Sequence, residues 1–258
     1  ETWKNGMEDM KTLAEIHFKH LQKLPLDKGE LIFLYELDQP IQSMGYGQDP
    51  RIKEILDQRN FKTDAPIVFG CEPSEIAWGK EAITEKTKAY IGTWSVEIFQ
   101  TVKNYPNIKH FYEAFPDKKI FLQSIETDPS INSPTKAEEA LRDQNIYLSD
   151  WGKDILDKTE FSQTKEKYDL VRFTVDQLGF PKGATTDEIY KKAKDLGLEL
   201  CPAEVGPHLR LQYTGKEWML TAMKQISDRY GYPHVFDLST NGAQLGLYGS
   251  YAEPDNRW

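Results

Sequence analysis

The sequence predicts an α+β fold with an N-terminal mixed α/β lobe, a helical connector and a C-terminal helix followed by an antiparallel β-meander. Three observations support this prediction: apolar residues recur at helical spacing near the N-terminus, short apolar runs alternate with helix-capping residues up to about residue 128, and a two-residue hydrophobic period follows Pro202. A chain of 258 residues can bury a core that needs neither a disulfide nor a metal for stability.

The first lobe, residues 1–128, begins with an amphipathic helix. Its inward-facing residues recur at three- and four-residue spacing: Met10, Leu13, Ala14, His17, Leu21 and Leu24. Pro25 ends this helix because proline disrupts the helical hydrogen-bond pattern. The apolar run Leu31–Tyr35 is compatible with either a buried strand or a buried helix, and periodicity does not decide between them.

Capping residues and short apolar runs predict the rest of this lobe. Asp49 caps a helix that has Pro50 at its favoured first position, and Ser95 caps another that reaches Lys103. The other expected elements are strands at Ile67–Phe69, Lys88–Ile91 and Lys119–Ile125, and helices at Ser74–Ala82 and Ile108–Phe115. The alternation of helices and strands indicates an α/β arrangement.

The middle segment, residues 129–180, is predicted to be a helical connector. It begins in a stretch rich in proline and small polar residues, 128–134, which is typical of a linker. Ser133 caps the first helix and Ser149 the second, and a third helix is expected over Lys165–Leu178.

The last segment, residues 181–258, is predicted to be a helix followed by a meander. Thr185 and Glu188 have the spacing of a capping box, and Gly197 supplies the left-handed residue that ends the helix. The expected strands lie around His208–Tyr213, Trp218–Ile226, Val235–Leu238 and Gln244–Tyr251, with a hairpin turn at Thr240–Gly242.

The run Gly183–Tyr213, which reads GATTDEIYKKAKDLGLELCPAEVGPHLRLQY, resembles a run shared by an uncharacterised family of bacterial hypothetical proteins. The likeness covers about the last 80 residues of the chain, with a looser likeness around Lys88–Gly92 and Lys119–Ile125. It implies a bacterial origin, and it carries over no activity and no site residue.

The charge balance and the two cysteines limit the partners and cofactors. The net charge of −9 disfavours binding to a phosphate backbone, and the apolar runs are too short to span a membrane. Cys71 and Cys201 lie in no metal-binding spacing, so we expect no cofactor and a soluble, cytoplasmic protein. A bridge between the two thiols would suit an exported form instead.

A row of polar side chains is the preferred candidate site. If His208–Tyr213 is a strand, then His208, Arg210 and Gln212 share one face and can meet an anion or a carboxylate. The alternative is a solvated sheet face on which Arg210 pairs with an acid such as Glu204.

Aromatic residues concentrate in the same meander, where exposed rings can hold a sugar or a peptide. These residues are Trp218, Tyr230, Tyr232, Tyr248 and Tyr251. We therefore predict that His208, Arg210, Gln212, Trp218 and Tyr248 bind a protein, peptide or sugar ligand. Core packing is the other explanation for the aromatic rings.

The remaining motifs do not indicate catalysis. His17 and His20 share a helix face but have no identifiable third metal ligand, and Gly45-Tyr46-Gly47 lacks the other residues of a phosphate loop. Neither cysteine has a neighbouring base that would activate it. The sequence thus favours a noncatalytic binding or interaction protein; the alternative is a hydrolase that brings a histidine and a carboxylate together between the lobes.

Overall fold

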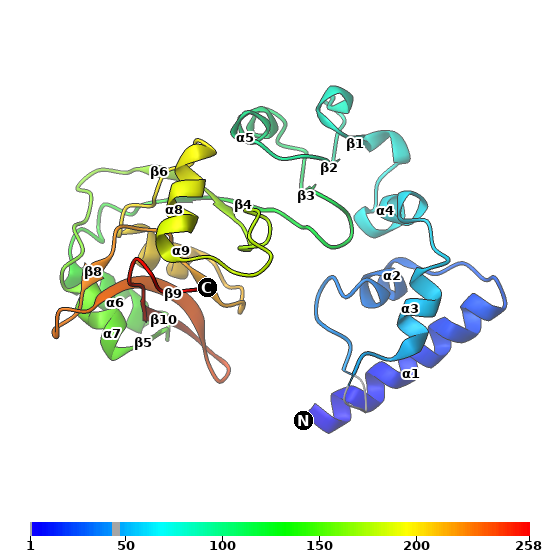
Figure 1. The fold of residues 1–258 in the computed structure, drawn as a ribbon, viewed down its shortest axis with the longest axis horizontal. Helices are drawn as coiled ribbons and strands as arrows, with labels where there is room; N and C mark the ends of the chain where they lie inside the picture. Colours follow the sequence, from blue (N-terminus) through cyan, green and yellow to red (C-terminus); the bar gives the residue numbers. More distant parts are fainter. Residues whose placement is uncertain (1, 43–46) are drawn as a thin grey trace. The chain divides into compact units, whose positions relative to one another are not determined.

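The computed structural model describes residues 2–42 and 47–258, so the Gly45-Tyr46-Gly47 turn falls largely outside the described residues. The elements form an α+β fold, as the sequence predicts, and they divide into two compact units, residues 1–120 and residues 121–258 (Figure 1). Each unit has its own hydrophobic core.

Helices are the main regular elements of the first unit. They are α1 (Thr2–Leu21), α2 (Lys28–Leu34), α3 (Pro50–Leu56), α4 (Phe61–Phe69) and α5 (Val96–Lys103), with short 3-10 turns at Pro73–Glu75 and Lys80–Ala82. The apolar run Leu31–Tyr35 belongs mostly to α2, because Asp27 and Glu30 form a capping box that starts a helix there. The caps predicted at Asp49 and Ser95 are confirmed.

The sheet of the first unit is small and parallel. Strands β1 (Ile76–Trp78), β2 (Ala89–Ile91) and β3 (His110–Tyr112) pair in the order β1-β2-β3. Residues Ala89, Tyr90 and Ile91 of the central strand are all buried, as expected of a parallel strand covered on both faces.

Three predictions for the first unit are wrong. Ile67–Phe69, predicted to be a strand, is the last turn of α4, which the Asn60 side chain caps and Gly70 ends at φ 66°. Ser74–Ala82, predicted to be a helix, contains β1 between two 3-10 turns. Ile108–Phe115, also predicted to be a helix, contains β3, because pairing with the buried strand β2 outweighs the local preference.

The main sheet of the second unit is mostly antiparallel. Its strands are β5 (Tyr147–Leu148), β7 (Met219–Leu220), β8 (Ile226–Ser227), β9 (Pro233–Asn241) and β10 (Gln244–Tyr251). The order is β5-β10-β9-β7, with β8 also paired to β9, and only β5 runs parallel to its neighbour among the described strands of this sheet. The predicted β9–β10 hairpin is confirmed, and Gly242 supplies its positive φ of 64°.

The second unit also contains a two-stranded antiparallel ladder and further helices. Strands β4 (Phe121–Glu126) and β6 (Lys167–Arg172) form the ladder. The helices are α6 (Pro134–Asp143), α7 (Asp150–Leu156), α8 (Thr186–Asp195) and α9 (Val205–Gln212). The caps predicted at Ser133, Ser149 and Thr185 are confirmed, with a full capping box at Thr185 and Glu188.

Several predictions for the second unit are wrong. Trp218–Ile226 is not one strand, because only Met219–Leu220 in β7 and Ile226 in β8 are extended there. Residues 129–180 are not an all-helical connector: they include β5, which pairs with β10, and β6, which occupies much of the helix expected over Lys165–Leu178. His208–Tyr213 is not a strand either, because His208 to Gln212 complete α9. In the described residues, no helix combines the length and the apolar character needed to cross a membrane.

Candidate functional site

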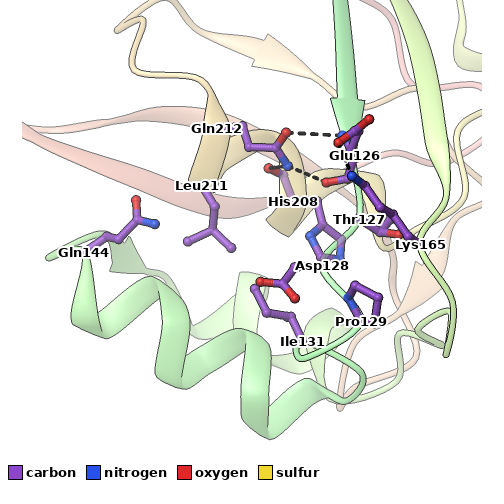
Figure 2. A pocket seen from close by; sticks show the side chains of 10 residues that line it. All are labelled: Glu126, Thr127, Asp128, Pro129, Ile131, Gln144, Lys165, His208, Leu211 and Gln212. Atoms are coloured by element: carbon purple, nitrogen blue, oxygen red, sulfur yellow. Dashed lines mark hydrogen bonds and ion pairs between the residues drawn. The ribbon is translucent and has the colours of Figure 1, made fainter.

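A candidate site is an open cavity of about 450 Å³ in the second unit, which we call the His208 pocket (Figure 2). Its volume lies in the range of small-ligand sites, about 300–1,000 Å³. It is lined by Glu126, Thr127, Asp128, Pro129, Ile131, Gln144, Lys165, His208, Leu211 and Gln212.

Helix α9 positions three of the lining residues. His208, Leu211 and Gln212 are spaced three and four positions apart, so they lie on one face of the helix. A strand would have placed His208 and Gln212 with Arg210 instead. The helix therefore keeps two of the predicted site residues together and separates the third from them.

Gln212 connects α9 to the end of β4. Its side-chain amide donates to the backbone oxygen of Glu126 at 2.8 Å and accepts from the backbone nitrogen of Glu126 at 3.2 Å. It also donates to the backbone oxygen of His208 at 3.2 Å. The amide thus pairs with both backbone groups of Glu126, as a residue of a neighbouring strand would. Figure 2 shows these hydrogen bonds as dashed lines.

His208 is the buried polar group of the pocket. Its side chain is 1% exposed, and its Nε2 atom has no hydrogen-bond partner. Burial lowers the pKa of His208, against the opposing effect of the charges on Glu204 and Asp128. At neutral pH the ring is therefore uncharged, and Nε2 is a buried polar atom with unused capacity to bond a ligand.

Two carboxylates give the pocket its charge. Hydrogen bonds from Ser130 lower the pKa of Asp128, and the hydrogen bond from Lys165 lowers the pKa of Glu126, so both are ionised at neutral pH. Lys165 forms an ion pair with Glu126. Glu126 and Asp128 are negative, Lys165 is positive and His208 is neutral, so the lining has a net charge of −1. This balance disfavours the anion or carboxylate ligand expected from the sequence.

Arg210 does not belong to the same face. Its side chain is 1% exposed, and its Nη2 atom donates to the backbone oxygens of Tyr213 and Gly215, at 3.1 Å for Gly215. Burial lowers its pKa. These contacts fix the backbone that follows α9. Arg210 is therefore a buried structural residue, and the prediction that it is an exposed binding residue is not supported by its position.

Glu204 is not the partner of Arg210. This buried carboxylate accepts hydrogen bonds from the backbone nitrogen of Ser162 at 2.8 Å, from the Ser162 hydroxyl, and from the Tyr168 hydroxyl at 3.0 Å. It holds the loop before β6 against the start of α9. The pairing proposed as the alternative explanation of the polar row is therefore wrong.

The two predicted aromatic site residues lie outside the His208 pocket. Trp218 is 56% exposed and its ring lies 6.3 Å from that of Trp258. Tyr248, on β10, packs against Tyr147 with ring centroids 5.4 Å apart. The residues missed by sequence reasoning are Asp128, Lys165 and Gln144, which come from loops and a helix end where no periodic signal exists.

Other reactive groups give little sign of a catalytic centre. The thiols of Cys71 and Cys201 are free, and burial raises the pKa of both, to about 11 for Cys201. Within residues 2–42 and 47–258, no group of three or more histidine, cysteine or acidic side chains could hold a metal ion.

Comparisons with family models, with curated proteins and with solved structures gave no significant match to this chain. The resemblance of Gly183–Tyr213 to bacterial hypothetical proteins stays a prediction.

Proposed function

We propose that the protein is a noncatalytic binding protein whose His208 pocket takes a basic side chain of a peptide or protein partner. The observation that carries the proposal is the unpartnered, buried Nε2 atom of His208 in a cavity whose lining has a net negative charge. A neutral imidazole can accept a hydrogen bond from an ammonium or guanidinium group.

The lining suits both parts of a lysine or arginine side chain. Asp128 supplies an exposed carboxylate for the charged end, and its Oδ1 atom already accepts from Ser130 at 2.8 Å and 2.7 Å, which holds the group in place. Ile131, Leu211 and Pro129 offer apolar surface to the aliphatic stem. The net charge of −9 favours the approach of a basic partner.

The test compares a lysine peptide with its acidic counterpart. The probes are acetyl-Gly-Lys-Gly-amide and acetyl-Gly-Glu-Gly-amide, titrated into the full chain by calorimetry at low salt. We expect saturable binding of the lysine peptide alone, weakened by added salt because the attraction is electrostatic.

The variant for this test is Asp128→Asn, which keeps the shape of the side chain and removes its charge. We expect it to weaken lysine-peptide binding by about tenfold, equivalent to about 1.4 kcal/mol. The matched control is Asp57→Asn, because Asp57 is an exposed carboxylate of the first unit and the change in net charge is the same. Equal effects of the two variants, or equal binding of both peptides, would contradict the proposal.

The hydrolase alternative stays a prediction. Among the described residues, histidine–carboxylate pairs within 4 Å occur at His17 and Glu54, 3.5 Å apart, and at His234 and Asp228, 3.7 Å apart. Neither pair lines the His208 pocket. Noncatalytic binding is therefore the function that this pocket supports best.

A further inference from the structure

A second hollow in the second unit, of about 330 Å³, is surrounded by aromatic rings. Five rings follow one another around it, and we call them the aromatic arc: Tyr230, Trp151, His234, Tyr251 and Tyr232. Successive ring centroids lie 6.0, 5.6, 5.9 and 6.2 Å apart in that order. The hollow is separate from the His208 pocket and shares no lining residue with it.

The fold assembles the arc from distant parts of the sequence. Trp151 is on α7, His234 is the second residue of β9, and Tyr251 ends β10, where it is the direct cross-strand neighbour of His234. The two other tyrosines belong to the loop between β8 and β9. Figure 1 shows α7, β9 and β10 close together in the second unit.

A buried carboxylate fixes the loop that carries the two tyrosines. Asp228 is 3% exposed, and its Oδ1 atom accepts from the backbone nitrogens of Tyr230 at 2.8 Å and Tyr232 at 2.9 Å. Its Oδ2 atom lies 3.7 Å from Nδ1 of His234, which is also buried. The backbone of this loop is thus held by the fold before any ligand arrives, which lowers the entropic cost of binding.

Four of the five rings of the arc are exposed, and the fifth, His234, is buried behind them. The exposed fraction is 41% for Trp151, 68% for Tyr230, 55% for Tyr232 and 39% for Tyr251. Side chains this large are seldom left in an exposed group without a binding role. These residues line one hollow rather than being dispersed over the surface.

The angles between the rings decide between two kinds of ligand. Three of the four successive pairs are steeply inclined: Tyr230 and Trp151 meet at 66°, His234 and Tyr251 at 73°, and Tyr251 and Tyr232 at 69°. Trp151 and His234 are stacked at 23°, and their two flanking pairs turn the tyrosine rings away from that plane. A flat sugar ring stacks on a flat aromatic platform, whereas steeply inclined rings surround a compact, rounded group. The geometry therefore disfavours the sugar that the aromatic content of the sequence suggested.

The charges around the arc favour a cation. Asp228 lines the hollow, and Glu253 accepts a hydrogen bond from Tyr251, whose pKa this bond raises to about 12. Two cations lie nearby: Arg229 is held by Asp154, with Nε 2.7 Å from Oδ2, and Lys158 donates to the backbone oxygens of Ser227 and Asp228 at 2.6 and 3.0 Å. The three carboxylates outnumber these two cations, the negative faces of the rings add to the field, and cages of aromatic rings bind quaternary ammonium groups.

We propose that the aromatic arc binds a trimethylammonium group, carried by a choline-type headgroup or by a fully methylated lysine. The inference does not depend on the function proposed for the His208 pocket, because the residues are different. It assigns the second unit a second site of distinct chemistry.

The test is an NMR titration that follows the indole Nε1 resonance of Trp151 in the full chain. Choline is the first probe, and 3,3-dimethyl-1-butanol, in which carbon replaces the charged nitrogen, is its neutral counterpart. We expect saturable shifts with choline and at least about tenfold weaker binding of the neutral compound, since the cation–ring attraction is lost. Nε-trimethyllysine amide is the third probe, and whichever cation binds more tightly identifies the source of the group.

Two variants locate the effect. Trp151→Ala should weaken choline binding at least about tenfold, measured through the remaining resonances of the arc. Trp218→Ala is the matched control, because it removes another exposed tryptophan of the same unit, and it should leave the affinity unchanged. The inference is overturned if neither cation binds, if the neutral compound binds equally well, if glucose or cellobiose displaces choline, or if the two variants behave alike.

Discussion

The two units bury charge in different ways. In the described part of the first unit, the buried charged side chain is Asp64, and Arg59 and Tyr35 satisfy both of its oxygens. In the second unit, the buried charged and titratable side chains are Asp154, Glu204, His208, Arg210, Asp228, His234 and Asp237. His208 and Arg210 retain nitrogen atoms without partners. The first unit also has polar atoms without a hydrogen-bond partner, His17 Nε2 and Glu113 Oε2, but both residues are only partly buried, and each atom lies within 4 Å of a residue of opposite charge type, Glu54 and Lys118. Fully buried side chains with unused polar capacity belong to the second unit, and both candidate sites are found there.

The largest effect is expected where buried charge is fully paired. In the first unit, Asp64 accepts from Nε and Nη2 of Arg59, both at 2.6 Å, and from the hydroxyl of Tyr35 at 2.7 Å. Asp64→Ala leaves both partners without their acceptor and should lower the free energy of unfolding by about 3–5 kcal/mol. Urea denaturation measures this loss.

The control for that prediction is Asp57→Ala in the same unit. Asp57 pairs with Lys53, and both side chains are well exposed, so the change should stay within about 0.5 kcal/mol. A similar cost for the two variants would show that the Asp64 cluster contributes no special stability.

A smaller loss is expected at Arg210, where the buried charge is incompletely paired. Arg210→Ala removes the donor to the Tyr213 and Gly215 backbone oxygens and leaves a cavity, so we expect a loss of about 2–4 kcal/mol. Arg210→Met should cost less, because it fills the space without burying a charge. Folded Arg210→Met protein should bind the lysine peptide with unchanged affinity, because Arg210 does not line the His208 pocket. Weakened binding would instead indicate that Arg210 is a binding residue.

The pH dependence of stability tests whether the pKa of His208 is lowered in the folded protein. Burial lowers the folded-state pKa of His208, so below about pH 6.5 the unfolded chain takes up a proton that the folded chain resists. Its contribution to stability is therefore present above the unfolded pKa and is lost as the pH falls toward the folded pKa. The slope from one such histidine reaches at most about 1.4 kcal/mol per pH unit.

His208→Gln should accordingly make the free energy of unfolding less dependent on pH between about pH 6.5 and 5, as urea denaturation at several pH values would measure. His110 in the first unit provides the comparison, because burial lowers its pKa in the same direction. His110→Gln should reduce the slope in the same sense. An unchanged slope in His208→Gln would mean that the ring binds protons equally in the folded and unfolded states, which contradicts the lowered pKa.

The smallest effect is expected at Trp218. Its side chain is 56% exposed, so Trp218→Ala should change the free energy of unfolding by less than about 1 kcal/mol. Lysine-peptide binding should also be unchanged, because Trp218 does not line the His208 pocket. Loss of peptide binding in this variant would instead support the sequence-based prediction that Trp218 is a binding residue.

Local capping chemistry made much of the helix content predictable. Thr185 with Glu188, Ser133 before Pro134, and Ser149 all cap helices in the structure, because each satisfies backbone donors that the helix leaves free. The β9–β10 hairpin was predictable for a similar reason, since Gly242 is suited to the positive φ of its turn.

The site was less predictable because two periodicities compete in α9. Alternation of His208, Arg210 and Gln212 with leucines indicated a strand, yet His208 and Gln212 are also four residues apart, as on a helix face. Pro207 within the first turn, where its missing donor costs nothing, was the available signal for a helix. Asp128 and the arc residue Trp151 meet their neighbours through tertiary packing, which single-sequence patterns do not encode.

The most direct test of the proposed function is the side-chain ¹⁵N spectrum of the histidines during titration with acetyl-Gly-Lys-Gly-amide. A basic side chain in the pocket should shift the His208 nitrogen resonances saturably and leave those of His234, in the other hollow, unchanged. A His208 signal that does not move while peptide binds elsewhere, or equal shifts at both histidines, would contradict the assignment of the His208 pocket as the binding site.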